Sequence, residues 1–168
     1  YAFYSNTYIT SITVPSSVKN IPAHAFDKCT SLETVTLSEG IESIGDYAFY
    51  NMGTNYFYTV TIPASVKEIA DNAFNGCSGL TSITIPNSVT KIGDYAFWYC
   101  YDLASVTMGN GIKSVGYDAF RDCTDLSEVH ITDVSAWCKI SFESADSNPL
   151  RSAYSLYMNG EQVTELVI

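Results

Sequence analysis

The sequence predicts a mostly β solenoid, in which similar coils stack on one another and each coil supplies one parallel strand and short helical turns. Three observations lead to this fold class. The phrase IGDYAFYNM at residues 44–52 returns almost unchanged as IGDYAFWYC at residues 92–100. The Phe of this phrase recurs in steps of 23, 23, 25, 23 and 23 residues. Every unit also repeats the same apolar positions, so each unit has an apolar face that only a neighbouring unit can bury.

The Phe of each Ala-Phe pair fixes the register of the repeat. These residues are Phe3, Phe26, Phe49, Phe74, Phe97 and Phe120. The single longer step falls in NMGTNYFYT at residues 51–59. Because the register is kept on both sides of this insertion, it marks a loop at a corner of one coil.

A strand follows each Phe. Stretches such as SITVP (residues 11–15) and SITIP (residues 82–86) alternate apolar residues with Ser and Thr. This period of two, carried by β-branched residues, is typical of a strand with one buried face. Pro15, Pro63 and Pro86 end three of these strands, because Pro has no N–H to donate to a ladder.

A second short element is expected in each unit. Apolar pairs three residues apart, such as Val89 and Ile92, predict a turn that leads into a brief strand, and Gly93 then supplies a bend. In the phrase Ala-Phe-x-x-Cys-x-x-Leu the apolar residues recur every third position, which predicts one or two turns of α or 3₁₀ helix with that face inward.

The recurring Cys is interpreted as a core residue. The column three residues after the Phe contains Cys29, Met52, Cys77, Cys100 and Cys123. A position that accepts Met requires a medium-sized apolar side chain, and buried Cys behaves as one. Stacked thiols point parallel and cannot all pair as disulfides, and the spacing matches no zinc motif.

The period of 23 residues fails after Ile131. Residues 133–168 are predicted to form an irregular segment, in which Trp137 and Phe142 carry enough apolar area to close the end of the stack. Asn159-Gly160 predicts a type I′ turn and hence a terminal hairpin. We expect this segment to be a cap, and the alternative is a dedicated binding insert.

Composition excludes several partners. The net charge is −10 and the eight Lys and Arg are scattered, so the chain lacks the basic stripe that nucleic acids or anionic membranes require. No apolar run approaches the roughly 20 residues of a spanning helix, so no membrane insertion is expected.

No set of residues predicts catalysis. His130 and Cys138 are close in sequence, but no third group that would orient them is indicated. Phosphate-binding loops and calcium loops are also missing from the sequence. We therefore expect a protein that is not an enzyme and that requires neither a cofactor nor a metal.

Aromatic residues beside the inward Phe are the first candidates for binding. If Phe49 and Phe97 face inward, their neighbours point mainly outward: Tyr47, Tyr50, Tyr95, Trp98, Tyr99 and Tyr101, which Tyr4, Tyr56 and Tyr117 could join. Exposed Tyr and Trp with few charges are typical of recognition surfaces and could stack on sugar rings. The alternative is that the rings only cover the backbone of adjacent coils.

The outward Ser and Thr of the strands form a second candidate surface. They could recognise a partner, or they could simply keep the sheet from associating laterally. Three residues depart from the hydroxyl pattern and are candidate contacts: Tyr58, Glu128 and His130.

The repeat itself resembles a known family. The pattern L-x-x-I-x-I-P-x-S-V-x-x-I-x-x-x-A-F-x-x-C-x-x-L, from Leu80 to Leu103, resembles the 23-residue leucine-rich repeat of BspA-like bacterial surface proteins. The resemblance covers residues 1–132 in six units and implies a leucine-rich repeat solenoid. The end VTELVI resembles another repeat strand, and the chain starts inside a repeat phrase, so we expect a fragment of a longer array.

The resemblance also implies a function. It implies a secreted or surface-displayed, non-enzymatic module that adheres to a host or neighbouring-cell protein, such as one of the extracellular matrix, or to a glycan. Two alternatives remain: a structural spacer, and a carbohydrate-binding module within a larger secreted protein.

Overall fold

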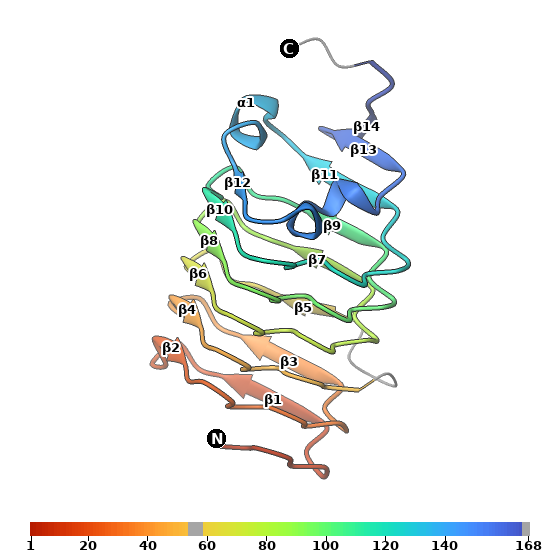
Figure 1. Ribbon diagram of the computed structural model, residues 1–168. Coiled ribbons are helices and arrows are strands. Elements are labelled where there is room, and N and C mark those ends of the chain that lie inside the picture. The colour runs from red at the N-terminus through yellow and green to blue at the C-terminus, as the bar shows by residue number, and fades with distance from the viewer. Residues whose placement is uncertain (54–58, 166–168) are drawn as a thin grey trace.

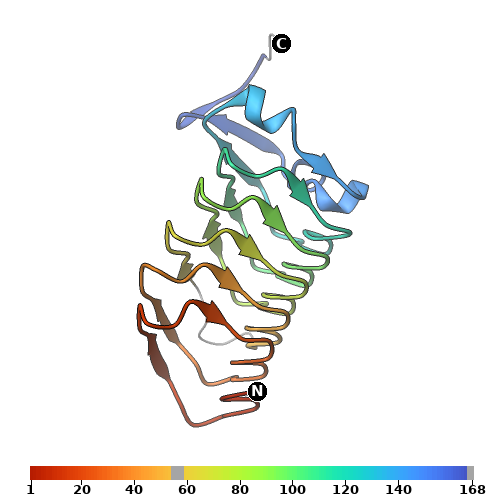
Figure 2. The same cartoon turned by 90° about the vertical axis from the view of Figure 1, so that its left-hand side faces the viewer.

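The computed structural model describes residues 1–53 and 59–165. Its coils stack along one axis, with the two termini at opposite ends of the stack (Figure 1). Each coil passes through a longer strand, a short strand and an Ala-Phe segment, which returns the chain to the next coil (Figure 2). We refer to these as the long-strand, short-strand and Ala-Phe sides.

The long-strand side is a parallel ladder, as the alternating pattern predicts. Its strands are β1 (Ser11–Val14), β3 (Thr34–Leu37), β5 (Thr59–Thr61), β7 (Ser82–Thr84), β9 (Ser105–Thr107), β11 (Glu128–Ile131) and β13 (Ser155–Met158). Ile83 lies opposite Val106, and Val106 lies opposite Val129, so one apolar column runs from coil to coil. β1 pairs with β3, while β5 to β13 form a separate ladder. The insertion lies largely in residues 54–58, outside the described residues.

The predicted brief strands form the short-strand side. They are β2 (Asn20–Ile21), β4 (Ser43–Ile44), β6 (Glu68–Ile69), β8 (Lys91–Ile92), β10 (Ser114–Val115) and β12 (Ser141–Phe142), which pair in parallel in this order. Gly93 follows β8 where two coils approach closely. A Cβ at Gly93 would lie 2.5 Å from the Asp71 nitrogen, so a larger residue requires the backbone to move.

The Ala-Phe side is a run of turns rather than a helix. In every coil from that of Phe26 to that of Phe120, two positions flank the Phe with positive φ, for example Tyr95 at 56° and Tyr99 at 60°. This backbone directs the N–H groups of Tyr95, Phe97 and Tyr99 to carbonyl oxygens of the next coil, at 2.9 to 3.2 Å. The three-residue spacing does turn Phe, Cys and Leu inward, as predicted. Turn bonds three residues apart, such as Trp98 N to Tyr95 O at 3.1 Å and Cys100 N to Phe97 O at 3.3 Å, occur beside the bonds between coils, so no continuous helix forms.

Stacked Phe rings form the centre of the core. Rings from successive coils lie nearly parallel, with centroids 5.2 to 5.5 Å apart from Phe3 to Phe120. Phe49, Phe74 and Phe97 are fully buried. The core therefore extends continuously through the stack, and each coil depends on its neighbours for burial.

The Cys column is buried, as predicted, and its thiols are free. Each Sγ also donates a hydrogen bond to a Phe carbonyl of the preceding coil. Cys29 reaches Phe3 O and Cys77 reaches Phe49 O, both at 2.9 Å. Burial raises the pKa of Cys77 and Cys100, and raises that of Cys123 to about 12.

Residues 133–165 continue both ladders despite the loss of the period. β12 pairs with β10, and β13 pairs with β11, so Leu156 lies beside Val129. The extra length forms α1 (Val134–Trp137) and two 3₁₀ turns, η1 (Ala145–Ser147) and η2 (Pro149–Arg151). After the turn at Asn159 and Gly160, β14 (Glu161–Gln162) pairs antiparallel with β13.

Candidate binding surface

The predicted aromatic residues lie on the Ala-Phe side, in the coils of Phe49 and Phe97. We define this surface, the aromatic surface, as the following residues: Tyr47, Tyr50, Tyr95, Trp98, Tyr99 and Tyr101. They occupy positions beside the inward Phe, and the turns of this side place them outside the core. The coil of Phe74 carries Asn72 and Asn75 at the corresponding positions and so separates the aromatic residues into two groups.

Tyr47 and Tyr50 form the first group. Their rings meet edge to face, with centroids 5.3 Å apart. Tyr47 also stacks on His24 at 4.8 Å, and His24 stacks on Tyr1 at 4.6 Å. A ladder of rings thus extends the surface toward the first coil. The sequence carries a signal for it, because Tyr1, His24 and Tyr47 occupy the same position of the repeat, two residues before the Phe.

The second group is a chain of rings. Trp98 stacks on Tyr99 with centroids 4.3 Å apart, and it contacts Tyr95 at 5.1 Å. Tyr99 contacts Tyr101 at 5.6 Å, and Tyr95 contacts Tyr117 edge to face at 5.8 Å. Tyr117, considered as an addition from the sequence, therefore joins the surface. Partial desolvation raises the pKa of Tyr95, with nearby Asp118 adding to the shift.

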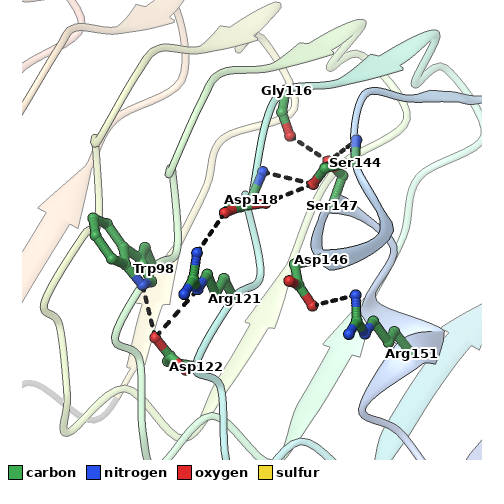
Figure 3. Close-up of polar contacts among 9 residues, drawn as sticks. All are labelled: Trp98, Gly116, Asp118, Arg121, Asp122, Ser144, Asp146, Ser147 and Arg151. Carbon is green, nitrogen blue, oxygen red and sulfur yellow. Dashed lines mark hydrogen bonds and ion pairs between the residues drawn. The ribbon is translucent and has the colours of Figure 1, made fainter.

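Polar contacts hold Trp98 in position (Figure 3). Its Nε1 donates to Asp122 Oδ2 at 2.9 Å, and the Arg121 guanidinium lies 5.9 Å from the ring. Arg121 Nη1 donates to the buried Asp118 at 3.0 Å, and this bond is the main cause of the raised pKa of Arg121. The indole is thus fixed by two residues of the neighbouring coil of Phe120, which lowers the entropy lost when a partner binds.

The rings of the aromatic surface are less exposed than the sequence predicts, since the sequence places them mainly outward. Tyr47, Tyr50, Tyr95 and Trp98 are half-buried, because each covers part of a neighbouring ring. Tyr99 is 36% exposed and Tyr101 44%. The rings therefore both shield the Ala-Phe side and present aromatic area to solvent, so the two sequence-based alternatives are compatible.

A pocket lies between the two groups. It has a volume of about 230 Å³, and Tyr50 from one group and Tyr99 and Tyr101 from the other line it. Gly76 also lines it, from the coil between them. Sequence reasoning missed this pocket, although Gly76 was a visible signal because the equivalent positions of the adjacent coils are Asn51 and Tyr99.

Glu128 and His130 lie elsewhere, on the outward face of β11. His130 Nε2 lies 3.1 Å from Glu128 Oε2, and its ring stacks on Tyr157 of β13 at 4.7 Å. The structure thus pairs these two candidates on the long-strand side and separates them from the aromatic surface. Tyr58 and Tyr56 lie outside the described residues.

Residues 1–53 and 59–165 contain neither a metal-binding cluster nor a membrane-spanning helix. Within residues 1–53 and 59–165, no group of three or more His, Cys, Asp or Glu is arranged to hold a metal ion. In the same part of the chain, no helix is long and apolar enough to cross a bilayer.

The coil geometry and the repeated phrase define a leucine-rich repeat solenoid. The family model described as BspA type leucine rich repeat region, in six copies, matches residues 1–127 and 52–150. The chain belongs to this family, as the resemblance of its repeat predicted. No curated protein sequence matches the chain significantly.

Solved bacterial leucine-rich repeat proteins share the fold. A protein of T. pallidum, TpLRR, is 31% identical with a TM-score of 0.67, over 72% of this chain and 58% of its own. A cell surface protein of Faecalibacterium prausnitzii is 30% identical with a TM-score of 0.73, over 84% of this chain and 37% of its own. The pneumococcal vaccine antigen PcpA is 26% identical with a TM-score of 0.65, over 86% of this chain and 33% of its own. The chain thus spans about a third to three fifths of the length of these proteins and is a repeat protein of the bacterial surface-protein type.

Proposed function

We propose that this chain is a non-enzymatic module that binds a protein outside the cell through the aromatic surface. The observation that carries the proposal is the fixed chain of rings from Tyr95 to Tyr101, which lies outside the core. The Phe stack already fills the interior, so these rings are not needed to complete it. Leucine-rich repeat folds are typically non-enzymatic and use their extended surfaces for binding.

The chemistry of the surface favours a protein partner. Tyr and Trp bury a large area on binding and lose little conformational entropy, and they are enriched at the centres of interfaces. Stacking and the Trp98–Asp122 bond restrict the rings before a partner arrives. We expect Trp98 and Tyr99 to contribute most, because they lie at the middle of the second group.

A location at the bacterial surface or in the medium fits this role. The similar F. prausnitzii protein is described as a cell surface protein, and PcpA as a vaccine antigen. A partner on a host or neighbouring cell, or in the extracellular matrix, would be accessible there. The surplus of carboxylates gives a net charge of −10, which favours neutral or basic protein surfaces.

The experiment measures binding of the immobilised chain to a panel of purified extracellular-matrix proteins by surface plasmon resonance. We expect saturable binding to at least one protein, weakened ten-fold or more by Tyr95→Ala combined with Trp98→Ala. The matched control is Tyr154→Ala, which removes an 88% exposed Tyr outside the surface. Binding that survives the double substitution would contradict the role of the aromatic surface.

A structural spacer is the second candidate, and the long-strand side favours it. Thr61, Thr84 and Thr107 lie opposite one another in register and present a uniform row of hydroxyls. Such a row suits a side that remains soluble without a partner. If the chain binds no protein of the panel, or if its binding survives both the double substitution on the aromatic surface and Glu128→Ala with His130→Ala, the spacer becomes the better account.

A further inference from the structure

The pocket at Gly76 arises from a missing side chain. Asn51, Gly76 and Tyr99 are equivalent in three successive coils, with φ values of 52°, 73° and 60°. Asn51 and Tyr99 project side chains at this position, whereas Gly76 leaves a gap between them. The pocket of about 230 Å³ occupies this gap.

The walls and floor of the pocket differ in chemistry. Tyr50 stands on one side, and Tyr99 and Tyr101 stand on the other, with the latter two rings tilted by 41°. Asn75 and Ser78 also line the pocket and are almost fully buried. The Asn75 amide nitrogen donates to Asn72 Oδ1 at 2.7 Å, which fixes its orientation and leaves its second amide hydrogen for a ligand.

Charge and size limit the occupant. The pocket is lined by Tyr, Asn, Ser and Gly, so no lining residue is charged at neutral pH, although the chain as a whole carries −10. An anion would find no cation there, and a cation would find no carboxylate. The volume is below the roughly 300–1,000 Å³ of pockets for drug-sized ligands, so it suits one small ring rather than an extended chain.

We propose that this pocket binds a single uncharged pyranose, such as the terminal sugar of a glycan carried by the protein partner. A pyranose has an apolar C–H face, which can pack on Tyr99 or Tyr101, and hydroxyls that can bond to Asn75 and Ser78. An apolar peptide side chain would instead leave these buried amide and hydroxyl groups without partners, which is costly. The inference rests on the proposed function, because it assigns part of the aromatic surface to the glycan of that partner.

The test titrates the ¹⁵N-labelled chain with the methyl glycosides of glucose, galactose, mannose and N-acetylglucosamine, to 50 mM, by NMR. We expect at least one glycoside to shift the amide signals of Gly76, Asn75 and Ser78 in a saturable way.

Gly76→Asn fills the pocket, and the fold tolerates Asn at the equivalent Asn51. A Cβ at Gly76 would lie 3.2 Å from Asn51 Cα, so the Asn51 backbone has to shift by a few tenths of an ångström. We expect the saturable shifts to be lost in this variant.

Two further variants complete the test. Gly160→Asn makes the same change at another glycine of positive φ, in the β13–β14 turn, where a Cβ would meet nothing within 4 Å, and it should bind like the original chain. Tyr101→Ala removes one wall without filling the pocket and should weaken binding at least five-fold.

The pocket inference is overturned if no glycoside gives saturable shifts, or if the shifts persist in Gly76→Asn. Matrix-protein binding that is lost in Tyr95→Ala with Trp98→Ala but kept in Gly76→Asn would leave the proposed function standing without the sugar site.

Discussion

The buried thiols show how one residue type serves two purposes. Cys77, Cys100 and Cys123 lie in the same buried core as the stacked Phe rings, and each Sγ donates to a carbonyl oxygen at 2.9 to 3.3 Å. Met or Val could supply the apolar volume but not the donor. Because burial disfavours the thiolate, these residues are poor nucleophiles while the protein is folded.

Thiol labelling tests this environment. At pH 8 we expect Ellman's reagent to modify one thiol rapidly, that of the exposed Cys138, and the four buried thiols only after unfolding in urea. The raised pKa values keep the buried groups protonated at this pH. Cys138→Ser should abolish the rapid phase. Rapid reaction of two or more thiols in the folded chain would contradict the buried assignment.

At the scale of elements, the last coil is attached through polar contacts as well as through strand pairing. Ser147, in η1, is fully buried, and its Oγ donates to Gly116 O at 2.7 Å and accepts from the Ser144 N–H at 2.9 Å. Ser144 Oγ in turn donates to Asp118 Oδ1 at 2.7 Å (Figure 3). Asp118 therefore joins the last coil to Arg121, beside the aromatic surface.

Ser147→Ala should destabilise the chain by about 1–3 kcal/mol, because it leaves the Gly116 carbonyl and the Ser144 N–H without their partner. Urea denaturation followed by circular dichroism gives the free energy of unfolding. The control Ser152→Ala changes an exposed serine of the same segment and should alter it by less than about 0.5 kcal/mol. Equal effects of the two substitutions would show that the buried contact contributes little.

At the scale of the whole molecule, the two ends of the stack differ. At the C-terminal end β14 pairs along the outer edge of β13, and β12 is the edge strand of the other ladder. At the other end β1 and β2 are edge strands of their ladders, and an apolar hollow of about 480 Å³ opens beside them. Phe3, Val18 and Ile21 are among the residues that line it. Exposed strand edges next to apolar area favour association between chains.

We therefore expect the chain to self-associate reversibly through its first coil. Sedimentation velocity should show a mean sedimentation coefficient that rises with concentration, and Val18→Lys should reduce this rise by placing a charge in the hollow. Thr164→Lys adds the same charge near the opposite end and should have no effect. A single monomeric species of the unmodified chain at every concentration would rule out this association.

Much of the fold was predictable because it depends on local, repeated patterns. The 23-residue spacing of Phe97 and Phe120, and the period of two around Ile83, specify which side chains face inward, whatever the details of the turns. The same spacing identified Trp98 and Tyr99 as neighbours of the core that lie outside it. To predict these features, it is enough to know in which direction successive side chains point along a coil.

Contacts between coils were decided by the tertiary structure. The left-handed backbone at Tyr95 and Tyr99 is stable because its N–H groups reach the next coil, and a helical pattern cannot reveal such bonds. Likewise, the pocket at Gly76 exists because coils stack Tyr50 and Tyr101 around a residue that is distant from both in sequence. The sequence by itself determined the repeat, its core columns and the family; stacking alone determined which outward residues meet, because that depends on the register between coils rather than on the order within one.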